Sequence, residues 1–542
     1  MYRITRFGGS LIAGAILAAS AQGQTAAMQT PRFAIERFQV DGNTLVPAAE
    51  IARGLTAFTG PSRDFADVQR AVETLEALYR ERGYNTAYVS VPEQELEKGV
   101  VRLRVIEGRI GQVTVTGNEH FSAANIRAAL PQLVEGEAPV AARLSENIQL
   151  ANENPSKQVE VVLGVGAREG EVNANIKVQD ERPYRFSATY DNTGTESTGQ
   201  HRLGVSVQHN NLFDRDHSAS FSYTMAPDKP EGVQVDIYSL GYRIPLYGLG
   251  DSIDLLYANS TVGVPSSSPS LGGSLGIVGK GDVFSLRYNW LQPRLGEYSS
   301  RVIFALDEKD MQSACKSAAG TPLTGTAGCE PYRVRTLAAT YSGRLEQPGR
   351  VVAFAVGPAL SIAHSSDHSY GLASGNRNAP TNFHAWRANG SLLQVLPEDW
   401  QLRLGGQLQW ATSALVPTEQ IGLAGSQAVR GFVERAVATD AGLFVQSEVY
   451  TPDLAGLTSA PGSLRALAFY DFANGRTHGA AAGGKNSRAA LASAGLGLRY
   501  SYDKRFSWRF DLAHVIDSHT DAPNTNPIDN GWRGHFSLTV GF

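Results

Sequence analysis

Residues Gln401–Trp410 read QLRLGGQLQW and alternate between polar and apolar side chains. Successive side chains of an extended chain point to opposite faces, so the leucines and Trp410 share one face. The other face carries Gln401, Arg403, Gln407 and Gln409. Segments of about ten residues with one apolar and one polar face are typical of transmembrane barrel strands, although the strands of a soluble sandwich also alternate.

The same alternation recurs from Arg182 to Phe542, and the connections between the segments distinguish a transmembrane barrel from a soluble sandwich. Sixteen such segments begin near residues 184, 201, 217, 233, 251, 282, 300, 333, 350, 382, 400, 442, 463, 489, 506 and 532. Connections after even-numbered segments are short and those after odd-numbered segments are mostly long, which is typical of an outer-membrane barrel. A hydrocarbon layer also requires the sheet to close. Residues 182–542 are therefore predicted to form a 16-stranded antiparallel transmembrane β-barrel.

The preceding residues show a duplicated pattern. Residues 32–108 and 109–181 each read as strand, two helices and two strands, and Val40–Asn43 (VDGN) aligns with Val115–Asn118 (VTGN) at an offset of 75 residues. A repeat at this period indicates duplicated modules. The open sheet edges of such modules can accept a guest strand, whereas blunted edges would make them spacers.

The N-terminus reads as an export signal. Arg3 and Arg6 precede the apolar run Leu11–Ala19, and Ala19-Ser20-Ala21 fits a signal-peptidase site, so residues 1–21 are predicted to be a signal peptide. No later apolar run is long enough for a transmembrane helix. Charged residues make up 18% of the chain and its net charge is −4, which argues against nucleic-acid binding.

The chain has two cysteines, Cys315 and Cys329, in one Ser/Gly/Thr-rich segment. In an oxidising compartment a local disulfide is the leading prediction, ahead of two free thiols or metal ligands. An even number of strands places both barrel ends on the periplasmic side, so this segment is expected outside the cell.

No enzyme signature is present, and no catalytic residue, cofactor or metal site is predicted. His364 and His368 have the spacing of helical metal ligands but lie in a segment that reads as a solvated loop.

One charged pair stands out. Residues 412–441 form a long connection that contains LAGSQAVRGF (Leu423–Phe432), with a single arginine, Arg430, beside a glycine. Asp471 lies on the predicted lumen face of the thirteenth segment, where a charge-assisted contact with Arg430 would hold the connection inside the barrel. Glu434 and Glu448 are alternative partners, and a solvated loop arginine is the plain alternative.

These motifs resemble those of the two-partner secretion transporters (TpsB, the haemolysin secretion/activation family), a branch of the POTRA–barrel outer-membrane superfamily. Val429-Arg430-Gly431-Phe432 matches the conserved loop motif of the family, and Phe469 and Asp471 match the F-x-D of its strand motif F-x-D-x-G. The two modules resemble POTRA domains, and Leu150–Pro155 resembles the end of the second-module helix. The terminal Phe542 resembles the signal read by the outer-membrane assembly machinery. The resemblance covers essentially the whole mature chain.

Two departures from the family are visible. The last glycine of F-x-D-x-G is Ala473 here, and Gly475 follows two residues later, so a close backbone approach at that point is in question. Phe33 follows the predicted cleavage site closely, so the N-terminal helix that plugs the pore in some members has little room.

The resemblance implies a bacterial outer-membrane translocator with its POTRA domains in the periplasm. Its partners would be a large, secreted, β-rich exoprotein, outer-membrane lipid and, during biogenesis, the assembly machinery. An insertase of other barrels is the nearest alternative, and a passive porin or an adhesin are alternatives from other classes.

Overall fold

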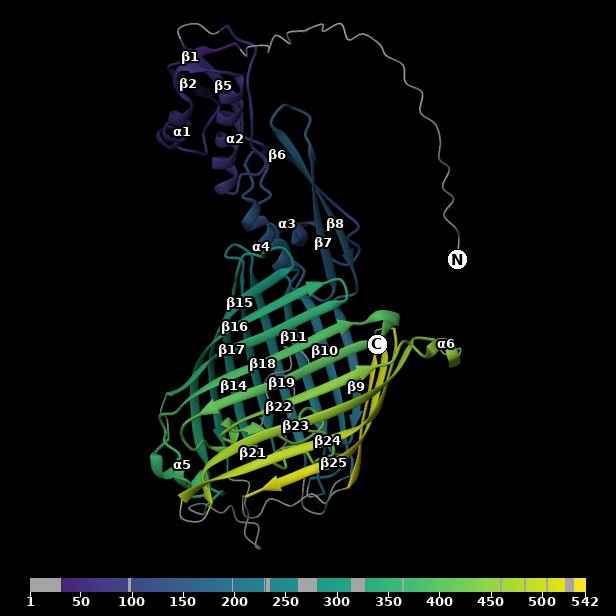
Figure 1. Ribbon diagram of the computed structural model, residues 1–542. Helices are drawn as coiled ribbons and strands as arrows, with labels where there is room; N and C mark the ends of the chain where they lie inside the picture. The colour runs from purple at the N-terminus through teal and green to yellow at the C-terminus, as the bar shows by residue number, and fades with distance from the viewer. Residues whose placement is uncertain are drawn as a thin grey trace, which may run out of the picture. The chain divides into compact units, whose positions relative to one another are not determined.

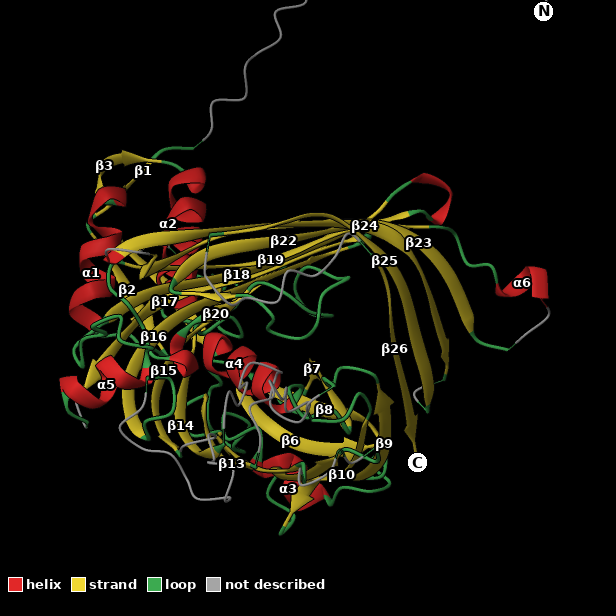
Figure 2. Ribbon diagram, turned by 90° about the horizontal axis from the view of Figure 1, so that it is seen from below, coloured by secondary structure: helices red, strands yellow, loops and turns green. Residues whose placement is uncertain are grey.

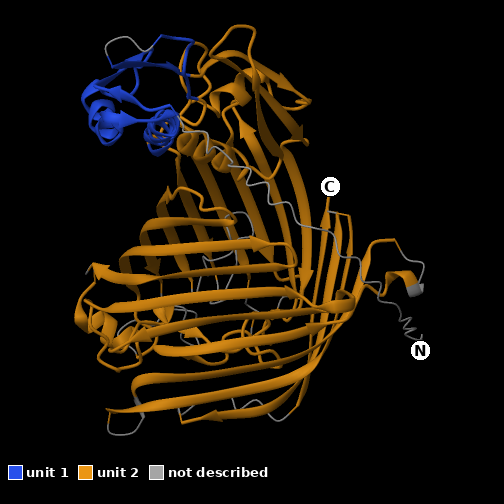
Figure 3. Ribbon diagram, turned by 45° about the horizontal axis from the view of Figure 1, so that its top comes forward, with its two compact units in different colours: residues 1–81, 87–107 blue, residues 82–86, 108–542 orange. Residues whose placement is uncertain are grey.

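The computed structural model describes residues 31–95, 99–196, 198–228, 230, 234–261, 280–312, 327–362, 365–458, 461–481, 484–503, 505–521 and 531–542. The chain divides into two compact units, residues 1–81 with 87–107 and residues 82–86 with 108–542 (Figure 3). The predicted signal peptide, residues 1–21, lies outside the described residues. So does most of the short stretch before Phe33 in which a plug was considered, of which only Pro31 and Arg32 are described.

The larger unit contains a closed, antiparallel barrel of sixteen strands (Figure 1). Every predicted segment is present, and each begins within a few residues of the predicted position, so this part of the prediction is confirmed. The strands are β9 (Tyr184–Asp191), β10 (Arg202–Leu212), β11 (His217–Met225), β12 (Asp236–Leu246), β13 (Asp251–Ser260), β14 (Gly281–Leu291), β15 (Tyr298–Met311), β16 (Tyr332–Gln347), β17 (Arg350–Ile362), β18 (His384–Val395), β19 (Gln401–Ala411), β22 (Ala441–Tyr450), β23 (Ser463–Ala481), β24 (Lys485–Tyr502), β25 (Phe506–Thr520) and β26 (Trp532–Gly541).

The barrel closes because β26 pairs with β9, with Leu538 opposite Tyr190. The outward face is apolar, as Val205 at 50% exposure and Trp410 at 53% illustrate, whereas the inward Arg202 is 2% exposed. This apolar-out arrangement is the reverse of a soluble sandwich and suits a lipid environment. No described helix is both long and apolar enough to cross a membrane.

The smaller unit is an α+β fold. Its core is the helix α2 (Phe65–Glu81), whose residues Val68, Ala71, Leu75 and Tyr79 are buried on one face. Helix α1 (Ala48–Leu55) packs beside it, and the strands β2 (Arg37–Asp41), β5 (Val100–Ile106) and β4 (Tyr88–Ser90) form a three-stranded sheet.

This unit contains one strand more than the predicted order of strand, two helices and two strands. The first strand is interrupted after Ile35: β1 (Phe33–Ile35) pairs with the additional strand β3 (Gly60–Arg63), and β2 pairs with β5. Pro47 is the N-cap of α1. Asp64 caps α2, since its Oδ1 accepts a hydrogen bond from the Asp67 amide at 3.1 Å.

Residues 109–181 repeat this order within the larger unit. Strand β6 (Arg109–Thr116) is followed by α3 (Ala123–Ala128), α4 (Ala141–Ala151), β7 (Lys157–Val165) and β8 (Glu171–Asp180). The sheet order is β6-β8-β7, so β7 is an edge strand. It ends in apolar side chains that include Leu163 at 40% and Val165 at 94% exposure.

The duplication extends to a shared turn. Gly42 and Gly117 both have positive φ, +87° and +81°, and a Cβ on either would lie 2.3 Å from the carbonyl oxygen of Val105 or Val178. Only glycine fits such a turn. In each module one carboxylate at the end of the last strand accepts backbone hydrogen bonds from the residues that follow this turn, Glu107 in the first and Asp180 in the second.

The repeated module is docked on a rim of the barrel. The Lys157 ammonium group, with no exposed surface, pairs with the carboxylate of Asp216 in the β10–β11 turn. Asn154 Nδ2 donates to the Asn210 carbonyl at 2.7 Å, and Asn147 Nδ2 donates to the Tyr247 carbonyl at 2.7 Å. These buried contacts place the module at the end of the barrel that carries the β10–β11 and β12–β13 turns.

Candidate functional site

The connection between β19 and β22, predicted as residues 412–441, folds into the barrel and ends at Asp440, because β22 begins at Ala441. It contains a short hairpin of β20 (Ile421–Gly422) and β21 (Ala438–Thr439), and Figure 2 shows β20 and the loops around it inside the ring of strands. Its apolar residues form one cluster with the barrel wall: Ile421, Leu423, Ala424, Ala428, Val429, Phe432, Val437, Phe444, Ala473, Ala489, Leu491 and Val515. The glycine- and alanine-rich sequence allows this close packing.

Arg430 sits at the centre of the loop and is 2% exposed. Its Nε donates to Asp471 Oδ2 at 2.7 Å and its NH2 donates to Asp471 Oδ1 at 2.8 Å, so the contact is bidentate. The Arg430 amide also donates to Asp471 Oδ2 at 3.2 Å. Asp471 has no exposed surface, and the pair is therefore shielded from water.

Of the alternative partners, one contributes and one does not. Arg430 NH1 donates to Glu448 Oε1 at 2.7 Å, and the carboxylate of Asp511 lies 3.5 Å away. Arg499 joins the same cluster, 2.8 Å from Asp511. Glu434 instead accepts from the Ser426 amide within the loop at 2.6 Å. The guanidinium groups of Arg430 and Arg499 thus share the carboxylates of Asp471, Glu448 and Asp511.

The flanking residues of the two motifs are packed around this cluster. Val429 and Phe432 are buried, and the Arg430 guanidinium carbon lies 3.6 Å from the centroid of the Phe469 ring. The Gly431 amide donates to His535 Nε2 on the last strand at 2.9 Å. His535 was not singled out from the sequence, although its place on the polar face of the last segment was visible.

The departure at Ala473 has a structural counterpart. Ala473 is buried in the apolar cluster, and the close approach occurs at Gly475. A Cβ on Gly475 would lie 2.5 Å from Thr439 Oγ1 and 2.6 Å from Leu423 Cδ1, both in the loop. The glycine that allows the loop to approach is therefore Gly475, two residues after the motif position Ala473 and on the same lumen-facing side of β23.

Several other predicted residues are placed as follows. Cys329 is disulfide-bonded, while Cys315 lies outside the described residues. Phe542 is 78% exposed, and its amide donates to the Phe186 carbonyl of β9 at 2.9 Å. His368 lies in α5 (Asp367–Ala373), and His364 lies outside the described residues. The described residues contain no group of three or more potential metal ligands.

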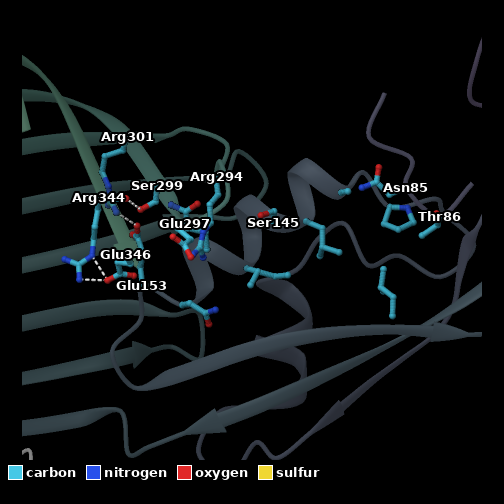
Figure 4. Close-up of a pocket in the computed structure, with 17 residues that line it drawn as sticks. Asn85, Thr86, Ser145, Glu153, Arg294, Glu297, Ser299, Arg301, Arg344 and Glu346 are labelled. Carbon is cyan, nitrogen blue, oxygen red and sulfur yellow. Dashed lines mark hydrogen bonds and ion pairs between the residues drawn. The ribbon is translucent and has the colours of Figure 1, made fainter. Parts of the chain in front are cut away.

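A second region lies where the repeated module meets the barrel rim. A cavity of about 490 Å³ is lined by α4, by Leu163 of β7 and by the β14–β15 and β16 ends of the barrel. Figure 4 shows charged side chains of both signs around it, among them Glu153 and Arg301, which form an ion pair. The cavity is therefore a recess of mixed character at the rim of the barrel, lined by apolar side chains such as Leu144 and Leu163 as well as by charged ones.

Comparison with known proteins identifies the fold and the family. Residues 33–108 match the family model described as "POTRA domain, ShlB-type", and residues 170–262 and 353–500 match that of "Haemolysin secretion/activation protein ShlB/FhaC/HecB". The smaller unit is therefore a POTRA domain, and both motifs around Arg430 and Asp471 lie within the second match.

Individual relatives agree. The chain is 21% identical over 525 residues to the heme/hemopexin transporter protein HuxB of Haemophilus influenzae, covering 94% of this chain and 87% of that one. It is 26% identical over 187 residues to the outer membrane transporter CdiB of Dickeya dadantii, covering 34% and 33%. The solved structure of CdiB from Escherichia coli superposes with a TM-score of 0.71 at 19% identity, covering 97% of this chain and 93% of that chain. The chain belongs to the haemolysin secretion/activation (ShlB/FhaC/HecB) family of two-partner secretion transporters.

Proposed function

We propose that this chain is the outer-membrane translocator of one large, β-rich exoprotein, which it binds unfolded in the periplasm and secretes through the barrel lumen. The observation that carries this proposal is the loop of residues 412–441, held inside a closed barrel by the buried Arg430–Asp471 contact. The module of residues 109–181, docked on the barrel rim, further disfavours a passive porin, because diffusion of solutes through a barrel requires no periplasmic domain.

We assign residues 109–181 as a second POTRA domain. The repeated element order, the matched turn glycines Gly42 and Gly117 and the matched carboxylates Glu107 and Asp180 support this assignment. Both POTRA domains then lie in the periplasm, since the second is docked at the barrel end that carries the short turns.

The exoprotein would meet the second POTRA domain first at β7. This strand has an open edge and exposed apolar side chains, which suit capture of an extended chain by strand addition. The recess beside α4 would then lead the chain to the lumen. The apolar outer wall contacts outer-membrane lipid, and Phe542 serves as the signal for the barrel-assembly machinery.

The loop contact is proposed to keep the loop in the position required for transport. We call Val429, Arg430, Gly431 and Phe432 the loop lock, with Phe469 and Asp471 as its lumen partner. Removing either charge of a buried pair costs roughly 3–5 kcal/mol because the other charge is left unpaired. That energy is enough to displace a loop while the hydrogen bonds of the strands keep the barrel folded.

The test co-expresses wild type or Asp471→Arg with a β-rich exoprotein of the two-partner secretion type and measures the exoprotein that reaches the medium. The expected result is loss of the exoprotein from the medium, with the barrel still folded by its heat-dependent gel mobility. The loop-lock role is wrong if Asp471→Arg secretes normally. An insertase remains the second candidate, and it predicts that other barrels, not one exoprotein, fall in abundance.

A further inference from the structure

A second buried ion cluster holds the first part of the same loop. Glu419, at the end of the 3-10 turn Pro417–Glu419, has no exposed side-chain surface. Its Oε1 accepts from Lys309 Nζ of β15 at 2.6 Å, and its Oε2 accepts from Arg387 NH2 of β18 at 2.7 Å. One carboxylate of the loop is thus held by two cations of the wall.

The backbone of Glu419 is held as well. Gln409 Nε2 of β19 donates to the Glu419 carbonyl oxygen at 2.8 Å, and the same side chain accepts from Arg387 Nε at 2.9 Å. The carboxylate and the carbonyl are therefore fixed by one connected network. A connected polar network of this kind specifies a single position for the loop.

The two anchors of the loop lie at different places in the barrel. Lys309 and Arg387 are on the seventh and tenth strands, whereas Asp471 and His535 are on the thirteenth and sixteenth. Lys309 is near the end of β15 that leads into the β15–β16 connection, away from the rim that holds the second module. The loop therefore spans the lumen between two parts of the wall, with Glu419 at the outer mouth.

The anchors also differ in how well water reaches them. Arg430 and Asp471 have side-chain exposures of 2% and 0%, whereas Lys309 and Arg387 have 12% and 39%. Hydrated cations hold a carboxylate less firmly than desolvated ones. Gly431 is moreover wedged against β24 and β25, where an added Cβ would lie 3.1 Å from Val515 Cγ2. The Glu419 anchor is the one that releases at lower cost.

We propose that Glu419 is a positioning residue that holds the first part of the loop across the outer mouth, and that it leaves Lys309 and Arg387 when the lumen opens while Arg430 stays bound. The proposal rests on the proposed function only in taking the lumen as the transport path. Release would place two cations on the freed wall, where water or carboxylates of a passing chain can solvate them.

The test measures ion conductance of the purified full-length protein in planar lipid bilayers, alongside secretion of the exoprotein. Glu419→Gln removes the charge and keeps the shape, and we expect lumen openings about tenfold more frequent, because the closed position loses two charge-assisted hydrogen bonds. Secretion should be retained. Glu308→Gln is the matched control, since Glu308 precedes Lys309 and therefore lies on the other face of β15, where it pairs with Arg335 of β16.

The variant Lys309→Gln/Arg387→Gln removes the cations and leaves the loop sequence intact, so it tests the same anchor if Glu419→Gln fails to fold. It should raise conductance in the same way. Unchanged conductance in both folded variants would overturn the proposal, and so would a loss of secretion as large as that of Asp471→Arg. Failure of the wild type to secrete the exoprotein would contradict the proposed function instead. The conductance measurement would still test the Glu419 anchor, because it requires no exoprotein.

Discussion

The Arg430 guanidinium stacks on the Phe469 ring, with 3.6 Å between its central carbon and the ring centroid, while it binds Asp471 edge-on. Phe469 and Asp471 are two residues apart on one strand and therefore face the same side. The F-x-D spacing thus supplies a ring for the face of the guanidinium and a carboxylate for its edge. This explains why both residues belong to one motif.

Replacing Phe469 by Leu should lower secretion while leaving the Asp471 contact possible. A cation–π contact in a desolvated site contributes about 2 kcal/mol, so the loop should leave its position more often. The exoprotein in the medium is measured relative to the barrel in the membrane. Phe472→Leu is the control, because Phe472 is on the outward face at 38% exposure. Equal secretion by Phe469→Leu and wild type would show that the ring has no positioning role.

Exchanging the charges of the main pair should restore only part of the secretion lost in Asp471→Arg. In the wild type, Glu448 Oε1 accepts from Arg430 at 2.7 Å and Asp511 lies 3.5 Å from Arg430. In Arg430→Asp/Asp471→Arg, the new loop carboxylate would face both of these carboxylates. Adding Glu448→Gln to the exchange should raise secretion further, since it removes a like charge. If the double exchange alone restores full secretion, the wider carboxylate cluster does not contribute.

Gly431→Ala should impair secretion through shape alone. Gly431 has φ +93°, and a Cβ there would lie 3.1 Å from Val515 Cγ2 and 3.4 Å from Ala513 Cβ. The backbone strain costs roughly 1–2 kcal/mol, and the wall contact adds to it. Combining Gly431→Ala with Val515→Ala should recover part of the secretion. Gly456→Ala is a control with no atom within 4 Å of the added Cβ.

The barrel was predictable because its pattern is local. The Arg430–Asp471 contact was one of the pairings that the lumen-facing position of Asp471 suggested, and the structure contains it, whereas most other contacts of the site were not predictable. The alternation in Gln401–Trp410 and its repeats located each strand, and Asp471 was assigned to the lumen from period two alone. The strand β3 was missed because Gly60–Arg63 (GPSR) carries no alternation. Glu419 and His535 were missed because their partners are far apart in sequence, and no spacing rule connects them.

The buried pair Lys157–Asp216 should fix the second module on the barrel. Burial lowers the pKa of Lys157, and the charge of Asp216 opposes that effect. Asp216→Ala should destabilise the joint by roughly 3–5 kcal/mol, because a buried ammonium group loses its partner. Limited proteolysis near residue 182 in detergent should then be faster. Arg127→Ala breaks the exposed Arg127–Glu135 pair and should change little.

The first POTRA domain should lose stability in acid through Glu107. Although burial alone would raise the pKa of the Glu107 carboxyl, hydrogen bonds from Thr44, Leu45 and Tyr79 hold it below its usual value. A lowered pKa stabilises the fold at pH values above the ordinary carboxyl pKa of about 4.3, and that stability is lost as the pH falls through the lowered pKa. At neutral pH, Glu107→Gln in the full-length protein should make residues 31–107 more sensitive to protease. Glu73→Gln, on the exposed side of α2, should behave as wild type at every pH. If wild type and Glu107→Gln are digested at the same rate at neutral pH, Glu107 does not support the Gly42 turn.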